Sequence, residues 1–242
     1  MMSILFNVIF RANFQMEYPE HTSSQYDAEL RAVCASVLKM GAVVANQFCL
    51  ALESLATGDL MLVDRVMDDG YAVNAMEVEI DECCTNLLVR RQPTANDLRL
   101  VKAIIKTIND LERVGDEAEN IARMPRSITP NKSASLPCYR QIKQMAGIAQ
   151  EILGAALAAF DGLDPDAAKK AGRKEALIDD EFHAVLRHLV AYMMEDTSEI
   201  SMALQAALVA RSVDRIGDHA KNIAEYVIYM VEGREVRNFS TL

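Results

Sequence analysis

One motif occurs twice in this sequence. "DLERVGDEAENIAR" occupies residues 110–123, and "SVDRIGDHAKNIAE" occupies residues 212–225, 102 positions later. Both copies contain an acidic residue, Arg, Val or Ile, Gly and Asp, followed by Ala-x-Asn-Ile-Ala. A motif repeated at this distance indicates that the chain consists of two similar structural units.

The segments around the motif are predicted to be helical. Only 10 Gly and 6 Pro occur among 242 residues, and Leu30, Val33 and Val37 begin a series of apolar residues spaced by three and four. This spacing is typical of a helix with one buried face. We expect six helices, over about residues 26–56, 60–91, 96–124, 138–160, 165–194 and 197–233. The predicted fold class is all-α, with two tandem three-helix bundles.

The stretch "PRSITPNKSASLPCY" is rich in proline and serine and separates the two halves. We expect a first bundle over residues 21–124, a linker over 125–137, a second bundle over 138–235 and a tail over 236–242. Residues 1–20 are expected to lie outside the fold. Their apolar run "SILFNVIF" lacks the flanks of a signal peptide, so we interpret residues 1–15 as an extension before a natural start at Met16.

The composition of the chain limits which partners and which cell compartment we expect. Acidic residues outnumber basic ones by 35 to 25, giving a net charge of −10. Nucleic acid is therefore not an expected partner, because its phosphates must be neutralised by Lys and Arg; a metal or a basic protein surface suits this charge better. No apolar run reaches the ~18 residues that span a membrane. Five cysteines without a C-x-x-C pair predict buried free thiols in a reducing compartment, the cytoplasm.

The repeated motif places acids where a helix should bury apolar residues. Val101, Ile104, Ile105 and Ile108 form a stripe that continues into Glu112, Gly115 and Asp116. In the last helix, small alanines lead to Asp214, Gly217 and Asp218. Carboxylates at i and i+4 repel each other, and a glycine within a helix costs about 1 kcal/mol relative to alanine. Either a hard cation or iron-type metal, or a buried salt-bridge network with Arg113, Arg215 or another basic side chain, could offset these costs.

Two more acid pairs have the same spacing, Glu175 with Asp179 and Glu77 with Asp81. If neighbouring helices place these pairs beside the motif, each half of the chain gathers four acids. Taken alone, Glu77 and Asp81 are better interpreted as part of a solvent-exposed helical face. The sequence contains no repeated Glu-x-x-His pair, zinc spacing, phosphate-binding glycine loop or Ser-His-Asp arrangement.

Four stretches resemble the PhoU family of phosphate-transport regulators: "RQPTANDLRLV" (91–101), "LERVGDEAENIA" (111–122), "AYMMED" (191–196) and "DRIGDHAKNIAEYVIYMVEG" (214–233). The resemblance extends from about His21 to Asn238. It implies two similar three-helix bundles and a negative regulator that couples the Pst phosphate ABC transporter, through its PstB ATPase, to a PhoR-type histidine kinase. It also implies restraint of phosphate uptake. We expect contact with the membrane only through these partners, and a homodimer or higher homo-oligomer.

Some members of the family carry multinuclear clusters of iron or another metal on their acidic motifs, whereas others carry none. By position, the resemblance assigns this role to Glu112, Asp116, Glu175, Asp179, Asp214 and Asp218. The family pattern has another acid where this chain has Gly70, four residues before Asn74, and the adjacent Asp69 is rotated by about 100°. We therefore expect the better metal site in the second half.

Two functions remain open at this point. The first is a signalling adaptor without catalytic activity. The second is a metal-dependent enzyme, such as a phosphatase, that acts at the carboxylate clusters.

Overall fold

A computed structural model describes residues 24–93, 95–127 and 136–234. Its elements are α2 (Ser24–Thr57), α3 (Leu60–Arg91), α4 (Ala95–Ser127), α5 (Tyr139–Gly162), α6 (Pro165–Arg173), α7 (Glu175–Glu195), the 3-10 helix η2 (Thr197–Glu199) and α8 (Ile200–Glu232). These ranges contain no strand, and the all-α prediction is confirmed. The expected extension, with the start at Met16, and the expected tail lie outside the described residues, as does most of the expected linker.

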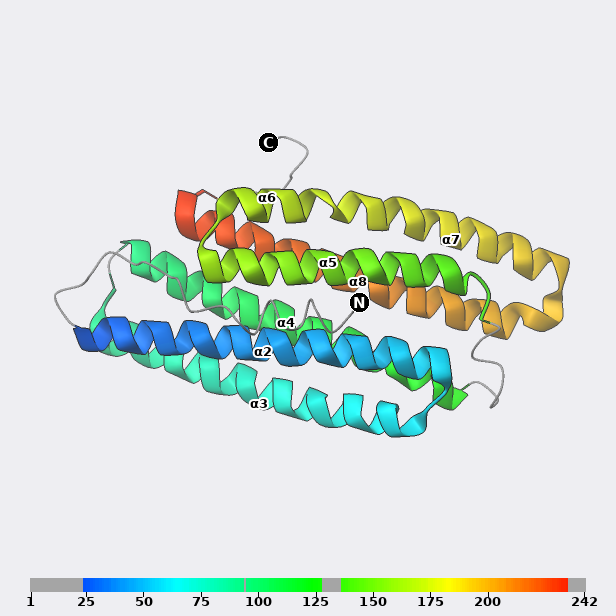
Figure 1. The fold of residues 1–242 in the computed structure, drawn as a ribbon, viewed down its shortest axis with the longest axis horizontal. Coiled ribbons are helices and arrows are strands. Elements are labelled where there is room, and N and C mark those ends of the chain that lie inside the picture. The colour runs from blue at the N-terminus through cyan, green and yellow to red at the C-terminus, as the bar shows by residue number, and fades with distance from the viewer. Residues whose placement is uncertain (1–23, 94, 128–135, 235–242) are drawn as a thin grey trace.

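The helices form two elongated bundles side by side (Figure 1). The first consists of α2, α3 and α4, and the second of α5, the successive α6 and α7, and α8. Val37, Met40 and Val44 are fully buried, which confirms the apolar face predicted for α2. All five cysteines are free, but Cys83 is exposed, so the prediction of buried thiols is wrong at that position.

Corresponding N-cap residues show which positions of the two bundles are equivalent. Asp59 accepts a hydrogen bond from the backbone of Met61 and begins α3, while Asp164 accepts two backbone hydrogen bonds and begins α6. Positions in α2 and α3 therefore correspond to positions 105 residues later. Positions in α4 correspond to positions 102 residues later in α8, as in the repeated motif.

One predicted helix is divided in the structure. The segment expected as one helix over 165–194 forms α6 and α7, which follow each other in nearly one line (Figure 1). At Lys174 the backbone changes to i to i+3 hydrogen bonds, from Lys174 to Ala171 and from Leu177 to Lys174. Gly172, a poor helix former, lies just before this point and is buried. The regular apolar pattern continues across Lys174, and for this reason the sequence does not indicate a break there.

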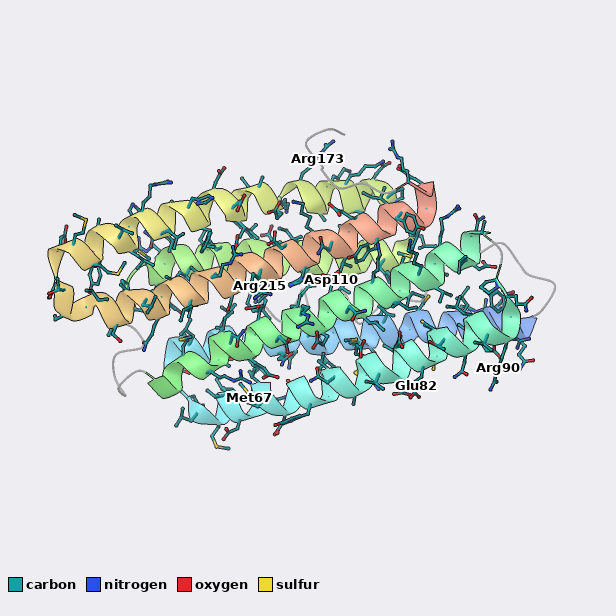
Figure 2. The ribbon with its side chains drawn as sticks, turned by 180° about the vertical axis from the view of Figure 1, so that it is seen from behind. Met67, Glu82, Arg90, Asp110, Arg173 and Arg215 are labelled. Atoms are coloured by element: carbon teal, nitrogen blue, oxygen red, sulfur yellow. The ribbon has the colours of Figure 1, made fainter. Side chains whose placement is uncertain are left out.

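The two motif helices, α4 and α8, join the bundles. They run antiparallel, and α4 has its most extensive contact with α8 (Figure 1). Between them, Asp110 lies 2.6 Å from Nδ1 of His219 and accepts a 3.1 Å hydrogen bond from Asn222. Arg215 pairs with Glu117 at 2.8 Å. Figure 2 shows Asp110 and Arg215 in this seam.

Among the described residues, one helix has the length and apolar composition of a membrane span, Gln25–Thr57. In its most apolar window, 44% of the residues are buried within the protein. A core helix of a soluble protein has the same properties, so this feature is weak evidence for a membrane span.

Candidate functional site

In the second bundle, the structure brings the four predicted acids together. Asp214 and Asp218 lie on α8, and Glu175 and Asp179 lie on α7. Asp214 is only 5% exposed, Glu175 is half-buried, and Asp218 and Asp179 are exposed. Burial raises the pKa of Asp214 to about 6, and the negative charges of Asp218, Asp179 and Glu175 add to the effect. The pKa of Asp218 is also raised, first by loss of water around it and then by Glu175. The pKa values of Asp214 and Asp218 therefore depend on the charges of the neighbouring carboxylates.

Basic residues compensate part of this charge. Arg211 contacts Asp214 at 2.7 Å, and Lys221 contacts Glu175 at 2.7 Å. Arg211 opposes the rise in the pKa of Asp214, but the direction remains upward. Two of the four carboxylates, those of Asp214 and Glu175, are thus paired with a cation.

Gly217 allows α7 to lie close to α8. A Cβ atom at Gly217 would be 2.6 Å from Cδ1 of Ile178, which is buried. Because Ile178 lies between Glu175 and Asp179 in the sequence, this contact places both acids beside α8. The glycine within the helix is therefore explained by close packing of helices.

In the first bundle, Glu112 and Asp116 lie on one face of α4, as predicted. Arg113 contacts both, at 3.3 Å and 3.4 Å. Burial raises the pKa of Glu112, followed by the charge of Asp116, and Glu77 of α3 also contributes. Glu77 is therefore close enough to Glu112 to affect its pKa.

A fifth acid, Glu119, was missed by the sequence analysis. A Cβ atom at Gly70 would clash with Oε1 of Glu119, so the glycine leaves the space that this carboxylate occupies. In the second bundle the corresponding residues are Glu175 and Lys221, which form the ion pair described above. Burial, Asp116 and Glu112 raise the pKa of Glu119. Its position seven residues after Glu112, on the same helical face, was the signal in the sequence.

Asp69 does not take the place of the acid that the family pattern has at position 70. Its pKa is raised mainly by burial, Asn46 of α2 lies beside its carboxylate, and its buried Oδ2 has no hydrogen-bond partner among the described residues. The rotation by one residue therefore directs Asp69 towards a different partner, as the helical geometry predicts.

The motif acids form ion pairs with one of the two named arginines, Arg113, and with one other basic side chain, Arg211. Arg113 pairs with the motif acids of its own helix, although it is 59% exposed. Arg215 instead reaches across the seam to Glu117 in the other bundle. The partner of Asp214 is Arg211, which precedes the motif and fits the alternative of another basic side chain.

The donor chemistry of both clusters suits a hard cation. All of their ligands would be carboxylate oxygens; burial is the largest cause of the raised pKa values of Asp214 and Glu119, and neighbouring carboxylates add to it. In the part of the chain that the structure describes, no three His, Cys, Asp or Glu side chains already stand in a metal-binding arrangement. Several of the carboxylates instead form ion pairs, with Arg211, Lys221, Arg113 and Arg123.

A groove of about 440 Å³ lies elsewhere, between α2 and α3. Its lining includes Glu29, Glu79, Cys83 and Arg90, but none of the motif acids. This groove is thus separate from the carboxylate cluster of the first bundle.

Known proteins match this chain over most of its length. The model of the PhoU domain family matches residues 37–124 and 142–227. A protein from Burkholderia sp., named phosphate-specific transport system accessory protein PhoU homolog, is 44% identical over 222 residues, covering 91% of this chain and 94% of the relative. The phosphate-specific transport system accessory protein PhoU of Escherichia coli (strain K12) is 37% identical over 219 residues, covering 90% of each.

Two solved structures have the same fold. The crystal structure of PhoU from Pseudomonas aeruginosa matches with a TM-score of 0.82 and 40% identity, covering 87% of this chain and 100% of that one. The phosphate transport system regulatory protein PhoU from Streptococcus pneumoniae matches with a TM-score of 0.81 and 28% identity, covering 88% of this chain and 100% of that one.

Proposed function

This chain belongs to the PhoU family, and from that premise we propose that it is an accessory protein of a phosphate-specific transport system and a negative regulator of the phosphate-starvation response. The observation that carries the proposal is the match to proteins of this name over about nine-tenths of both chains. In this role the chain couples a Pst-type ABC transporter, through its PstB ATPase, to a PhoR-type histidine kinase. It also restrains phosphate uptake.

The proposed place of action is the cytoplasm, with the membrane reached only through the partners. The net charge of −10 supports this arrangement, because anionic lipids would repel such a protein. The proposed assembly is a homodimer or higher homo-oligomer.

Deleting the gene and assaying alkaline phosphatase in abundant phosphate tests the regulatory function. A negative regulator predicts high alkaline phosphatase activity in the deletion strain and a return to baseline when the gene is restored. Unchanged low activity in the deletion strain would contradict the proposal. Measuring phosphate uptake in the same strains tests the second part of the role, since loss of restraint predicts faster uptake.

We further propose that Asp214, Asp218, Glu175 and Asp179 hold an iron-type or other metal ion, or a cluster of such ions. The support is the convergence of four carboxylates from two helices and the raised pKa values of Asp214 and Asp218. Binding would require Arg211 and Lys221 to leave their carboxylate partners. Metal analysis of the purified wild type and of the Asp214→Asn, Asp218→Asn variant checks this, and equal metal content in both proteins would contradict it.

The proposed role is not catalytic. The purified protein is expected to show no hydrolysis of phosphate esters with added Mg²⁺, Mn²⁺ or Fe²⁺. Turnover that disappears in the Asp214→Asn, Asp218→Asn variant would instead identify a metal-dependent enzyme.

A further inference from the structure

The outer side of α3 presents an exposed line of acidic and apolar side chains. Asp68, Tyr71, Val78 and Glu82 follow one another at intervals of three, seven and four residues, which places them on one side of the helix. All four are exposed, Tyr71 by 75% and Val78 by 54%. Within the part of the chain that the structure describes, neither Asp68 nor Glu82 forms an ion pair. We call this line the acidic face.

The corresponding line in the second bundle carries the opposite charge. By the offset of 105 residues, Arg173 of α6 corresponds to Asp68, and Arg187 of α7 corresponds to Glu82. Both arginines are exposed, and neither forms an ion pair with another described residue. We call the line from Arg173 to Arg187 the basic face. Equivalent positions of the two bundles therefore have charges of opposite sign.

The basic face is continuous across the break at Lys174. Ala171 before the break and Ile178 after it are both buried, as are their counterparts in α3, Val66 and Val73. The arginines on either side of the break therefore stay on the outer side of the bundle.

The two faces match in length. Asp68 and Glu82 are 14 residues apart, and so are Arg173 and Arg187, which corresponds to about 21 Å along a helix. When two such helices lie side by side, both acids therefore meet an arginine at the same time. Charges of opposite sign at equal spacing make the two surfaces complementary.

The acidic and basic faces lie on opposite edges of the molecule. α3 runs along one outer edge and α6 with α7 along the other (Figure 1), and Figure 2 shows Glu82 and Arg173 at these two edges. The two faces of one chain therefore cannot pair with each other. When the acidic face of one copy meets the basic face of another, one face of each copy stays open, so the contact is head-to-tail rather than twofold.

We propose that the acidic face of α3 docks on the basic face of α6 and α7 in a second copy of this chain. The helices run antiparallel, so that Asp68 lies opposite Arg187 and Glu82 lies opposite Arg173. Repetition of this contact links copies into a chain or a closed ring. The proposal rests on the homo-oligomer in the proposed function and gives that oligomer its contact surfaces.

Apolar and small side chains occupy the centre of this contact. In the antiparallel register, Val78 lies opposite Leu177, which is 54% exposed, and Tyr71 lies opposite Ala184. Burial of the exposed apolar side chains favours association, while the charged ends select the partner and its register. A second copy is favoured over an unrelated basic protein, because this chain itself provides both complementary faces.

Sedimentation velocity of the purified full chain, at several protein concentrations and low salt, tests this contact. The wild type should self-associate, and added salt should weaken the association because it screens exposed charges. Asp68→Arg with Glu82→Arg should weaken self-association at least about tenfold, since arginines would then face arginines. Arg173→Glu with Arg187→Glu should have the same effect, because acids would then face acids.

Mixing the two double variants provides the decisive measurement. The first variant has two basic faces and the second has two acidic faces, so neither should associate alone. An equimolar mixture should associate about as well as the wild type, because each basic face then finds an acidic one. A chain with all four replacements has its two faces exchanged and should also associate by itself.

General repulsion between negatively charged copies predicts a different result. Asp68→Arg with Glu82→Arg changes the net charge from −10 to −6, because each replacement adds two charges, and general repulsion would then fall. Weaker association of this variant would therefore depend on the faces themselves. Glu53→Arg, at an exposed position of α2, should not weaken association. Asp180→Asn should not weaken it either, because Asp180 lies opposite Ala75 and gains no cation there.

Three results would overturn the proposal. A wild type that stays monomeric at every concentration rejects it together with the homo-oligomer. An oligomer whose association survives both double variants rejects this contact alone, and so does a mixture of the folded double variants that does not associate. Circular dichroism checks that each variant is folded. If a double variant is unfolded, the single replacements Asp68→Arg and Arg187→Glu take its place, since these residues form one opposing pair.

The regulatory function is tested separately. None of these sedimentation results changes the outcome expected for alkaline phosphatase in the deletion strain. Failure of the contact and failure of the regulatory proposal are therefore distinguishable.

Discussion

At the scale of single residues, the buried carboxylate of Asp214 makes stability depend on pH. Its pKa is raised from 3.8 to about 6. Above pH 6 the ionised carboxylate costs the folded state free energy, and this cost disappears as the pH falls towards 4, because the folded protein then holds a proton. We predict that Asp214→Asn is more stable than the wild type at pH 8 by about 1–3 kcal/mol, and that the difference shrinks towards zero near pH 4.

Urea unfolding of both proteins at several pH values checks this prediction. Asp180→Asn is the matched control, because Asp180 is an exposed aspartate on α7, and its effect should stay within about 0.5 kcal/mol. If Asp214→Asn is less stable at pH 8, the ion pair with Arg211 outweighs the cost of burial.

At the scale of elements, glycines in apparently similar helical positions differ in what surrounds them. An added Cβ at Gly147 of α5 would meet no atom within 4 Å, whereas at Gly217 it would press on Cδ1 of Ile178 at 2.6 Å. We predict that Gly147→Ala stabilises the protein by about 0.5–1 kcal/mol, through helix propensity. Gly217→Ala should destabilise it by about 1 kcal/mol, because overpacking between α7 and α8 exceeds that gain.

Chemical denaturation of both variants measures the two effects. Ile178→Val removes the Cδ1 methyl group, so the free energy lost in Gly217→Ala should be smaller when Ile178→Val is the background. An equal loss in both backgrounds would show that the contact between α7 and α8 is not the cause.

At the scale of the whole molecule, the seam between α4 and α8 holds the bundles together through a buried acid. Asp110 is 8% exposed and interacts with His219, Asn222 and the hydroxyl group of Tyr226. Replacing it by alanine leaves these three groups of the second bundle without their partner. We predict that Asp110→Ala lowers the free energy of unfolding by about 2–4 kcal/mol.

Equilibrium urea unfolding, followed by circular dichroism, provides the measurement. The neighbouring Asn109 is exposed and bonds only within its own helix, to the carbonyl oxygen of Ile105 at 2.7 Å. Asn109→Ala should therefore change stability by no more than about 0.5 kcal/mol. A small effect of Asp110→Ala would indicate that apolar packing alone holds α4 against α8.

The sequence by itself determined the helices, the two-bundle fold and the spacing of the acid pairs on α7 and α8. These features depend on local periodicity, capping residues and a visible repeat, all of which are encoded within short stretches of chain. The break at Lys174 was not predictable, because the apolar pattern runs through it. The tertiary structure also decided which charged residues are neighbours. Arg215 forms an ion pair with Glu117 rather than with an acid of its own motif, and the carboxylate of Glu119 occupies the space beside Gly70. Such partners depend on how helices distant in sequence lie against each other, and on whether a glycine leaves room between them.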